Sequence, residues 1–259
     1  NDWENMSACR QFADAAEAAR AKAAAQIAAD EKTLLDANAS KSDRESAIDR
    51  LAVNHDGATR LVELESEKKL PPEFVDFTGA AIYAKSDAGV RAMASQYFPR
   101  KNASGIALPT IPQLAAMKGD AERGRQVFFG KLAACANCHR FDGQGKDVGP
   151  DLTTIRTKYA RPQLLDNILN PSASIAFGYE PWMIKTKDGQ VYVGFVLADG
   201  RQVTLKESTG QQRVIPKRDI VQRKKQPFSI MPDNVALGLK AQDLADLAEF
   251  LLNEPVKQK

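Results

Sequence analysis

The stretch Cys135-Ala136-Asn137-Cys138-His139 decides how this sequence of 259 residues is interpreted. Two of the three cysteines and one of the two histidines of the chain lie within it, whereas Cys9 and His55 lie far upstream. A structural zinc site needs about four ligands, which this inventory does not supply. A redox-active dithiol typically lies between a strand and a helix, but Cys135 follows a predicted helix and precedes an irregular loop. Neither of these alternatives fits the segment well.

The spacing of the two thiols fits a haem instead. Two cysteines separated by two residues can bond to the two vinyl groups of one haem, and the adjacent histidine then faces the iron. The motif therefore predicts one covalent haem c attached to Cys135 and Cys138, with His139 as an axial ligand. Because such attachment occurs on the outer side of a bacterial membrane, we expect a periplasmic or otherwise extracytoplasmic protein. The sequence begins at Asn1 without a signal peptide, which we expect to have been removed or to lie outside this sequence.

A second axial ligand has to come from elsewhere in the chain. His55 is one possibility, but it lies in a separate helical region. The methionines are Met6, Met93, Met117, Met183 and Met231. Met231 is favoured because Pro232 follows it, which stiffens a loop just before a predicted C-terminal helix. Core packing is the alternative role for a methionine, and it is the expected one for Met93 on a helical stripe and Met183 in a strand.

An axial histidine usually donates its other ring N–H to a nearby acceptor. The segment Gly149-Pro150-Asp151-Leu152 follows the attachment motif, and the Pro150 carbonyl is the candidate acceptor. A simple turn at Gly149-Pro150, with no role toward the histidine, explains these two residues equally well.

The region around the motif is predicted to be helical, with an inserted β structure. Helices are expected from Gly119, over Arg161–Leu169 and around Leu244–Leu251. Between the last two, the periodicity changes to that of strands separated by Asp-Gly and Thr-Gly turns. The strand candidates are Trp182–Thr186, Val191–Leu197, Gln202–Glu207 and Arg213–Pro216. The insertion, residues 179–226, is predicted to be a small antiparallel barrel that serves either as a lid over the haem edge or as decoration.

Residues 1–100 are predicted to form a separate helical domain. The stretch Ser7–Ala39 is rich in alanine and free of Gly and Pro. Ser42 and Glu45 have the spacing of a capping box that opens the next helix. Residues 101–118 contain Pro and Gly between polar residues and are predicted to be a linker to the domain 119–259. The predicted fold class is mainly α.

Composition and charge exclude some classes of function. The net charge of +3 is too small to indicate nucleic-acid binding, and no apolar run is long enough for a membrane span. A local cluster of basic residues near the end of the insertion fits two explanations, a solvated surface or a docking site for an acidic redox partner near the haem edge. Its members are Arg213, Lys217, Arg218, Arg223, Lys224 and Lys225. Cys9 is a leftover thiol that either pairs with another chain or is buried.

Four motifs resemble those of class I cytochrome c. They are Gly119-Asp120-x-x-x-Gly124-x-x-x-Phe128, Cys135–His139, Gly149-Pro150-Asp151-Leu152 and a Met-Pro pair before a C-terminal helix. The resemblance implies that the Gly and the aromatic residue lie where the first and last helices cross. It also implies that the prolyl carbonyl accepts a hydrogen bond from the axial histidine and that Met231 occupies the sixth iron position.

A narrower resemblance covers about residues 118–253. The matching strings are Val148–Thr153, Leu164–Ser172, Gly178-Tyr179-Glu180, Lys187-Asp188-Gly189 and Ser229–Pro232. They are similar to the haem-binding domain at the C-terminus of exported planctomycete and verrucomicrobial proteins. Residues 42–100 resemble, more weakly, the HEAT-like helices that often precede that domain.

The expected function is therefore one-electron transfer by a monohaem cytochrome that is itself no enzyme. The resemblance implies that the electrons come from a dehydrogenase partner or fused domain. A second hypothesis is a gas-binding sensor or peroxidase-like haem protein, if Met231 does not hold the sixth position. A third, compatible with the first, is that the N-terminal helices are a scaffold for a partner.

Overall fold

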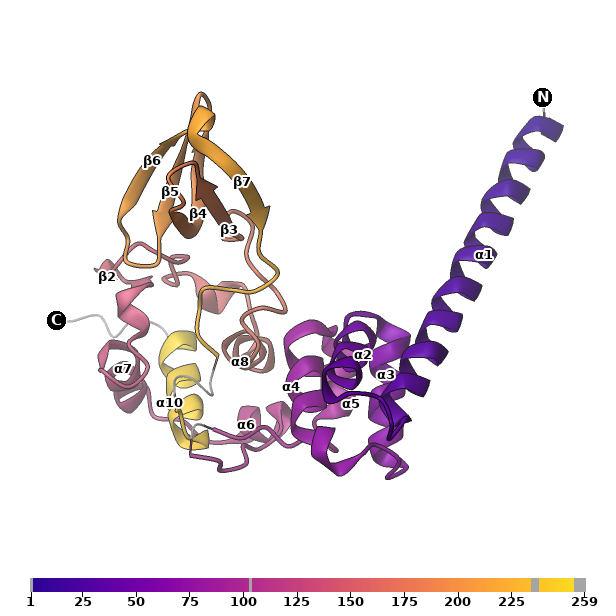
Figure 1. Ribbon diagram of the computed structural model, residues 1–259. Helices are drawn as coiled ribbons and strands as arrows, with labels where there is room; N and C mark the ends of the chain where they lie inside the picture. Colours follow the sequence, from indigo (N-terminus) through magenta and orange to yellow (C-terminus); the bar gives the residue numbers. More distant parts are fainter. Residues whose placement is uncertain (1, 103, 234–237, 254–259) are drawn as a thin grey trace. The chain divides into compact units, whose positions relative to one another are not determined.

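The chain folds into two compact units. The computed structural model describes residues 2–102, 104–233 and 238–253, without the side chains of residues 2–13 and of Ala88 (Figure 1). Contacts divide the chain into an N-terminal unit, Asn1–Phe98, and a C-terminal unit, Pro99–Lys259. About half of the chain is helical, and none of the described helices combines the length and apolar character needed to cross a membrane.

The N-terminal unit consists of helices and the turns that connect them, among its described residues. Its helices are α1 (Asp2–Leu35), α2 (Lys41–Val53), α3 (His55–Ser66), the 3-10 helix η1 (Pro72–Phe74), α4 (Val75–Lys85) and α5 (Ala88–Ala94). Fully buried Ile48, Leu51 and Leu61 pack in one core with Phe74 and Ile82. This is the apolar stripe that the helical periodicity predicts.

The start of α2 differs from the predicted one. The cap is Ser40, whose Oγ accepts a hydrogen bond from the Asp43 N–H at 3.1 Å, and not the Ser42–Glu45 pair. Both pairs have the required spacing of three residues. Ser40 caps the helix because Lys41 is already helical, which places Ser42 inside the first turn.

The C-terminal unit contains the remaining helices and all described strands. In chain order these are α6 (Ile111–Ala116), α7 (Ala121–Phe129), η2 (Cys135–Asn137), β1 (Arg140–Phe141), β2 (Gln144–Gly145), η3 (Ile155–Thr157), α8 (Arg161–Leu169), β3 (Pro181–Thr186), β4 (Val191–Asp199), β5 (Gln202–Glu207), β6 (Gln212–Pro216), η4 (Lys217–Asp219), β7 (Ile220–Lys225) and α10 (Ala241–Leu252). Within the segment predicted as a linker, 101–118, α6 buries Leu114 in the core of this unit.

Helices α7 and α10 cross at very short range. A Cβ atom on Gly124 would overlap the Asp246 carbonyl of α10 and lie 2.7 Å from the Phe250 Cβ. Gly119 meets the Ala245 carbonyl in the same way. Phe128 is fully buried beside this crossing, with its ring centroid 5.7 Å from that of Phe250. The absence of side chains at two positions therefore lets the backbones of the two helices touch.

The same crossing carries a buried carboxylate. Asp246 is 2% exposed and accepts hydrogen bonds from Arg123 Nε at 2.7 Å, Arg123 Nη2 at 3.0 Å and the Asp120 N–H at 2.8 Å. Gln242, one turn earlier on α10, donates to it at 2.8 Å. Burial raises the pKa of Asp246, but these hydrogen bonds outweigh it, so the pKa is lowered overall. The carboxylate thus joins the start of α7 to α10.

We predict that Asp246 makes the C-terminal unit less stable at acid pH than at neutral pH. Its folded pKa lies below the unfolded value of about 3.9. Its contribution is therefore complete above that value and is lost as the pH falls through the folded pKa. Asp246→Asn should lower the free energy of unfolding at neutral pH by roughly 2 kcal/mol and weaken the acid dependence. Denaturant titrations at neutral and acid pH measure both effects. Exposed Asp142→Asn is the control, and an unchanged acid dependence in Asp246→Asn would contradict the prediction.

The inserted β structure is an open sheet. Its strand order is β6-β5-β4-β3-β7, and all described neighbours are antiparallel. The prediction of a barrel-like insertion is wrong, because β6 and β7 are the edges of the sheet and do not pair with each other. The pattern of residues 212–225 indicated only one strand, but Pro216 and η4 divide the segment into β6 and β7, which lie on opposite edges.

A small core holds one face of this sheet. Ile184, Val203 and Leu205 are fully buried, with Ile215 almost so. Two guanidinium groups lie over aromatic rings that pack beside this core. The Arg223 guanidinium is 4.3 Å from the centre of the Trp182 ring, and the Arg213 guanidinium is 4.4 Å from the centre of the Tyr192 ring. Arginine is used here as packing surface as well as charge.

Candidate haem site

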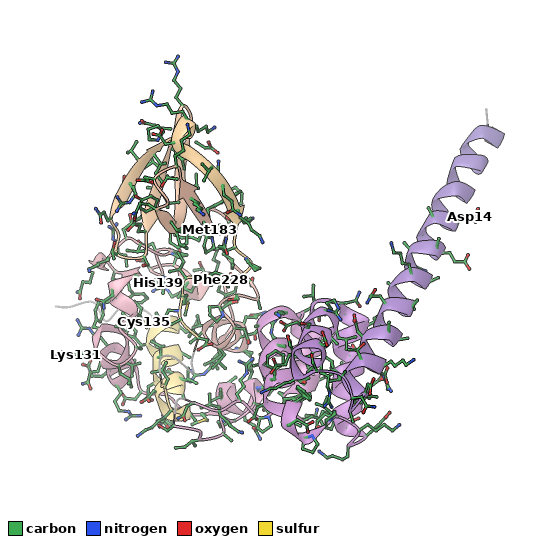
Figure 2. All side chains as sticks on the ribbon, in the orientation of Figure 1. Asp14, Lys131, Cys135, His139, Met183 and Phe228 are labelled. Carbon is green, nitrogen blue, oxygen red and sulfur yellow. The ribbon has the colours of Figure 1, made fainter. Side chains whose placement is uncertain are left out.

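The two cysteines of the attachment motif lie on a short turn of the C-terminal unit. Residues Cys135–Asn137 form η2, and the N–H groups of Cys138 and His139 donate to the Cys135 carbonyl at 3.0 and 2.8 Å. Figure 2 shows Cys135 and His139 in the part of the unit below the sheet. Both thiols are free and half-buried. Burial raises the pKa of the Cys135 thiol to about 11 and also raises the pKa of the Cys138 thiol.

The ring of His139 is held by the loop that follows. Its Nδ1 lies 2.7 Å from the Pro150 carbonyl oxygen. Because a carbonyl can only accept, the Nδ1–H donates and Nε2 remains for a metal. Burial lowers the pKa of His139 more than the Pro150 carbonyl raises it, which favours the neutral imidazole that a metal requires. The structure thus brings together His139 and the acceptor that the sequence proposed for it.

Backbone contacts fix this loop against the motif. The Val148 and Gly149 N–H groups donate to the Cys138 carbonyl at 2.9 and 2.7 Å. A Cβ atom on Gly149 would lie 2.8 Å from the His139 Cε1, so the backbone here is flush against the imidazole ring. Glycine at this position is therefore a packing requirement of the histidine.

Met231 lies in the loop of residues 226–233 that follows β7. Its half-buried side chain packs on the same apolar cluster as Cys135, Ala136, Leu152 and Tyr159. Of the other methionines, one shares this cluster and two lie elsewhere. Met117 also packs on this cluster, and Met183 lies in β3, opposite Val193 and Lys224. Met93, predicted to pack in the core, is 41% exposed on α5 in the N-terminal unit.

One arginine beside this cluster has an unused donor. Arg156 lies in η3 between Ile155, which is part of the cluster, and Tyr159, which packs against it. Its Nη1 is buried and has no hydrogen-bond partner among the described residues. A buried guanidinium N–H without an acceptor is costly. The two propionate carboxylates of a haem are acceptors of the kind that would satisfy it, so this residue fits the predicted cofactor.

The inserted sheet packs on the loop that carries Pro150. Lys206 of β5 is only 13% exposed, and its Nζ lies 3.4 Å from the Asp147 carboxylate. In the turn between β5 and β6, the Cβ position of Gly210 lies 3.3 Å from the Val148 Cγ2. Burial, followed by the nearby Asp147 and Asp151 carboxylates, raises the pKa of Tyr179 at the start of the insertion. The sheet is therefore fixed to the axial-histidine side of the site.

The basic cluster at the end of the sheet is largely neutralised. Asp199 binds both Lys217 and Arg223, at 2.7 and 2.6 Å. Glu207 binds Arg213 at 2.7 Å, and Glu180 binds Lys225 at 3.0 Å. Arg218 and Lys224 form no ion pair with the described residues. The local positive charge is thus smaller than the sequence run indicates.

Two further candidates lie away from this site in the chain. The His55 ring belongs to the N-terminal unit and pairs through Nδ1 with the Asp87 carboxylate at 2.7 Å. The side chain of Cys9 lies outside the described residues. Among the described residues, no three His, Cys, Asp or Glu side chains form a cluster that could hold a metal ion.

Sequence reasoning did not find several of these residues. Asp246, Lys206 and Ser229 act through partners that are distant in the chain, so spacing alone gave no signal. For Arg156, the only signal was a basic residue shortly after Gly149-Pro150, and the neighbouring Lys158 shares it.

Comparison with known proteins shows what part of the C-terminal unit is similar to. Residues 121–195 match the model of the cytochrome c family. A cytochrome c-553-like protein of Synechocystis sp. (strain ATCC 27184 / PCC 6803 / Kazusa) is 30% identical over 73 residues, which is 28% of this chain and 66% of that protein. The alignment thus spans just under two thirds of the relative's length. The family match ends at Phe195 in β4 and does not include Met231.

These matches show what residues 121–195 of the C-terminal unit are similar to. The cytochrome c family binds haem c covalently and transfers electrons through it. Haem c is accordingly the cofactor, as the attachment motif predicts.

Proposed function

We propose that this chain is an exported one-electron carrier in which Cys135 and Cys138 hold haem c and His139 and Met231 are its axial ligands. The hydrogen bond of 2.7 Å between His139 Nδ1 and Pro150 is the observation that carries the proposal, because it leaves Nε2 as the ring nitrogen available to iron. When bound, haem c supplies a one-electron iron couple. The chain supplies the ligands, a buried site and the surface through which a partner approaches.

Met231 supports the carrier function because it packs on the apolar cluster that includes Cys135. A methionine on iron fills the sixth position and leaves no site for a substrate. It also raises the reduction potential relative to two histidines. This supports a module that passes single electrons. That they come from a dehydrogenase partner or fused domain is what the family resemblance implies. The N-terminal helices, which resemble HEAT-like repeats, would then hold that partner.

We expect Met231→Ala to abolish the weak far-red absorption band of a methionine–ferric iron bond. The reduced variant should also bind carbon monoxide without denaturant, because its sixth position is open. Met117→Ala is the matched control, since Met117 packs on the same cluster. Oxidised and reduced visible spectra of the three proteins measure the effect. If the wild-type band were absent, or survived in Met231→Ala, the gas-binding or peroxidase-like function would replace electron transfer.

We also propose that Arg156 binds a haem propionate through its unused Nη1. A nearby positive charge stabilises the reduced haem, so Arg156→Met should lower the reduction potential by about 50 mV, equivalent to roughly 1 kcal/mol for a one-electron couple. Arg201→Met removes the same charge from an exposed position and should have little effect. Potentiometric titration of the two variants tests the proposal, and equal potentials would refute it.

A further inference from the structure

A chain of two hydrogen bonds ties the loop of Met231 to the end of α8. The Met231 N–H donates to Ser229 Oγ at 3.1 Å, and the Ser229 N–H donates to Ser172 Oγ at 3.0 Å. All three residues are half-buried. The two serines thus act in series. Ser229 accepts from Met231 through its Oγ and donates to Ser172 through its backbone N–H.

The anchor of this chain is itself firmly held. Ser172 follows Asn170 and Pro171 at the end of α8, and Asn170 is 4% exposed. The Asn170 side chain accepts from Arg100 Nη2 at 2.6 Å and donates to Asp166 at 2.5 Å. Arg100 Nη1 also donates to the Leu169 carbonyl at 3.1 Å. Ser172 therefore lies close to a helix end that hydrogen bonds hold in place.

The loop of Met231 needs such an anchor. The Gln226 N–H still bonds to the Pro181 carbonyl at 2.8 Å, beside the last pair of the sheet. The described residues 227–233 that follow belong to no helix or strand. Neither a strand ladder nor a helix fixes the backbone of Met231, so the serine pair supplies the restraint on it.

We propose that Ser229 and Ser172 are positioning residues that hold Met231 at the iron. This inference rests on the proposed function, because it assumes that Met231 is the sixth ligand. A thioether is a weak ligand that competes with water and with added bases for ferric iron. Restricting the loop raises the fraction of time that the sulfur spends at the metal. Losing one restraint therefore opens the site more often without removing the ligand.

Imidazole binding to the ferric holoprotein measures how often the site is open. Ser229→Ala and Ser172→Ala should each raise the apparent imidazole affinity about two- to tenfold, the factor that one hydrogen bond contributes. The double variant should show the same increase as either single variant, because the serines act in series. Ser229→Thr keeps the hydroxyl and should restore wild-type affinity. Ser174→Ala is the matched control, because Ser174 is exposed and lies only two residues after Ser172.

The outcomes separate this inference from the proposed ligation. If Met231→Ala loses the far-red band but both serine variants bind imidazole as the wild type does, the positioning role is refuted and the ligation stands. If Met231→Ala keeps the band, the ligation fails and the positioning role fails with it. Additive effects of the two serines would also refute the series arrangement.

Discussion

Gly124→Ala is expected to lower the free energy of unfolding of the C-terminal unit by about 3 kcal/mol. The added methyl group would overlap the Asp246 carbonyl, which belongs to the backbone of α10 and cannot move to another rotamer. The two helices must separate, and the packing of Phe128 on Phe250 must open with them. Alanine gains about 1 kcal/mol over glycine as a helix former, which offsets only part of this cost. Since domains of this size are stable by only about 5–15 kcal/mol, the loss is large.

Denaturant unfolding followed by haem absorbance measures this effect in the C-terminal unit alone. Gly200→Ala is the control, because no atom lies within 4 Å of its Cβ position and its φ is not left-handed. Equal stability of the two variants would mean that α7 and α10 can move apart without cost. That result would remove the close crossing from the description of the fold.

The crossing illustrates how far the sequence can predict this fold. The helix crossing was expected from the resemblance to class I cytochrome c. The spacing of Gly124 and Phe128 agrees with it, because residues four positions apart lie on one side of a helix. The partner residue was not predictable. Asp246 lies 123 positions after Arg123, and only the folded chain shows that its carboxylate completes the contact.

In the inserted sheet, the individual strands could be predicted but their overall arrangement could not. Alternating residues and Asp-Gly turns predicted the strands Gln202–Glu207 and Val191–Leu197 closely, because a two-residue period is a local property. Closure of the sheet is a global property, and the prediction of a barrel was wrong. The segment after Pro216 returns to the far edge beside β3 instead of to β6. Its charged residues Arg223, Lys224 and Lys225 carried no strand signal.

Site residues that are adjacent in the sequence could be predicted, whereas contacts between distant parts of the chain could not. The spacing of Cys135, Cys138 and His139 predicts haem attachment by itself, and the family match agrees with it. Pro150 was only one of two equally good explanations of a Gly-Pro pair until its carbonyl was placed beside His139. The assignment of Met231 stays a prediction that the spectra of its alanine variant will test.

Gly149→Ala is expected to disturb the axial histidine directly. The backbone of Gly149 is not left-handed, so alanine can adopt it, and the three atoms nearest to the methyl position all belong to the imidazole. The new Cβ would lie 2.8 Å from His139 Cε1 and 3.1 Å from Nδ1. Either the ring tilts away from the Pro150 carbonyl or the loop lifts from the Cys138 carbonyl, and both changes break a hydrogen bond of 2.7 Å.

Two measurements detect this change. The free energy of unfolding should fall by about 2 kcal/mol, the sum expected from overpacking and a weakened hydrogen bond. The His139 Nδ1 proton should exchange with solvent at least about tenfold faster, because its acceptor is displaced at a cost above roughly 1.4 kcal/mol. Gly200→Ala again supplies the control. If the variant kept both its stability and the slow exchange, the loop would be free to yield, and Pro150 would not be what orients the ring. The hydrogen bond would then be a consequence of the position of His139, and iron binding through Nε2 would need another cause.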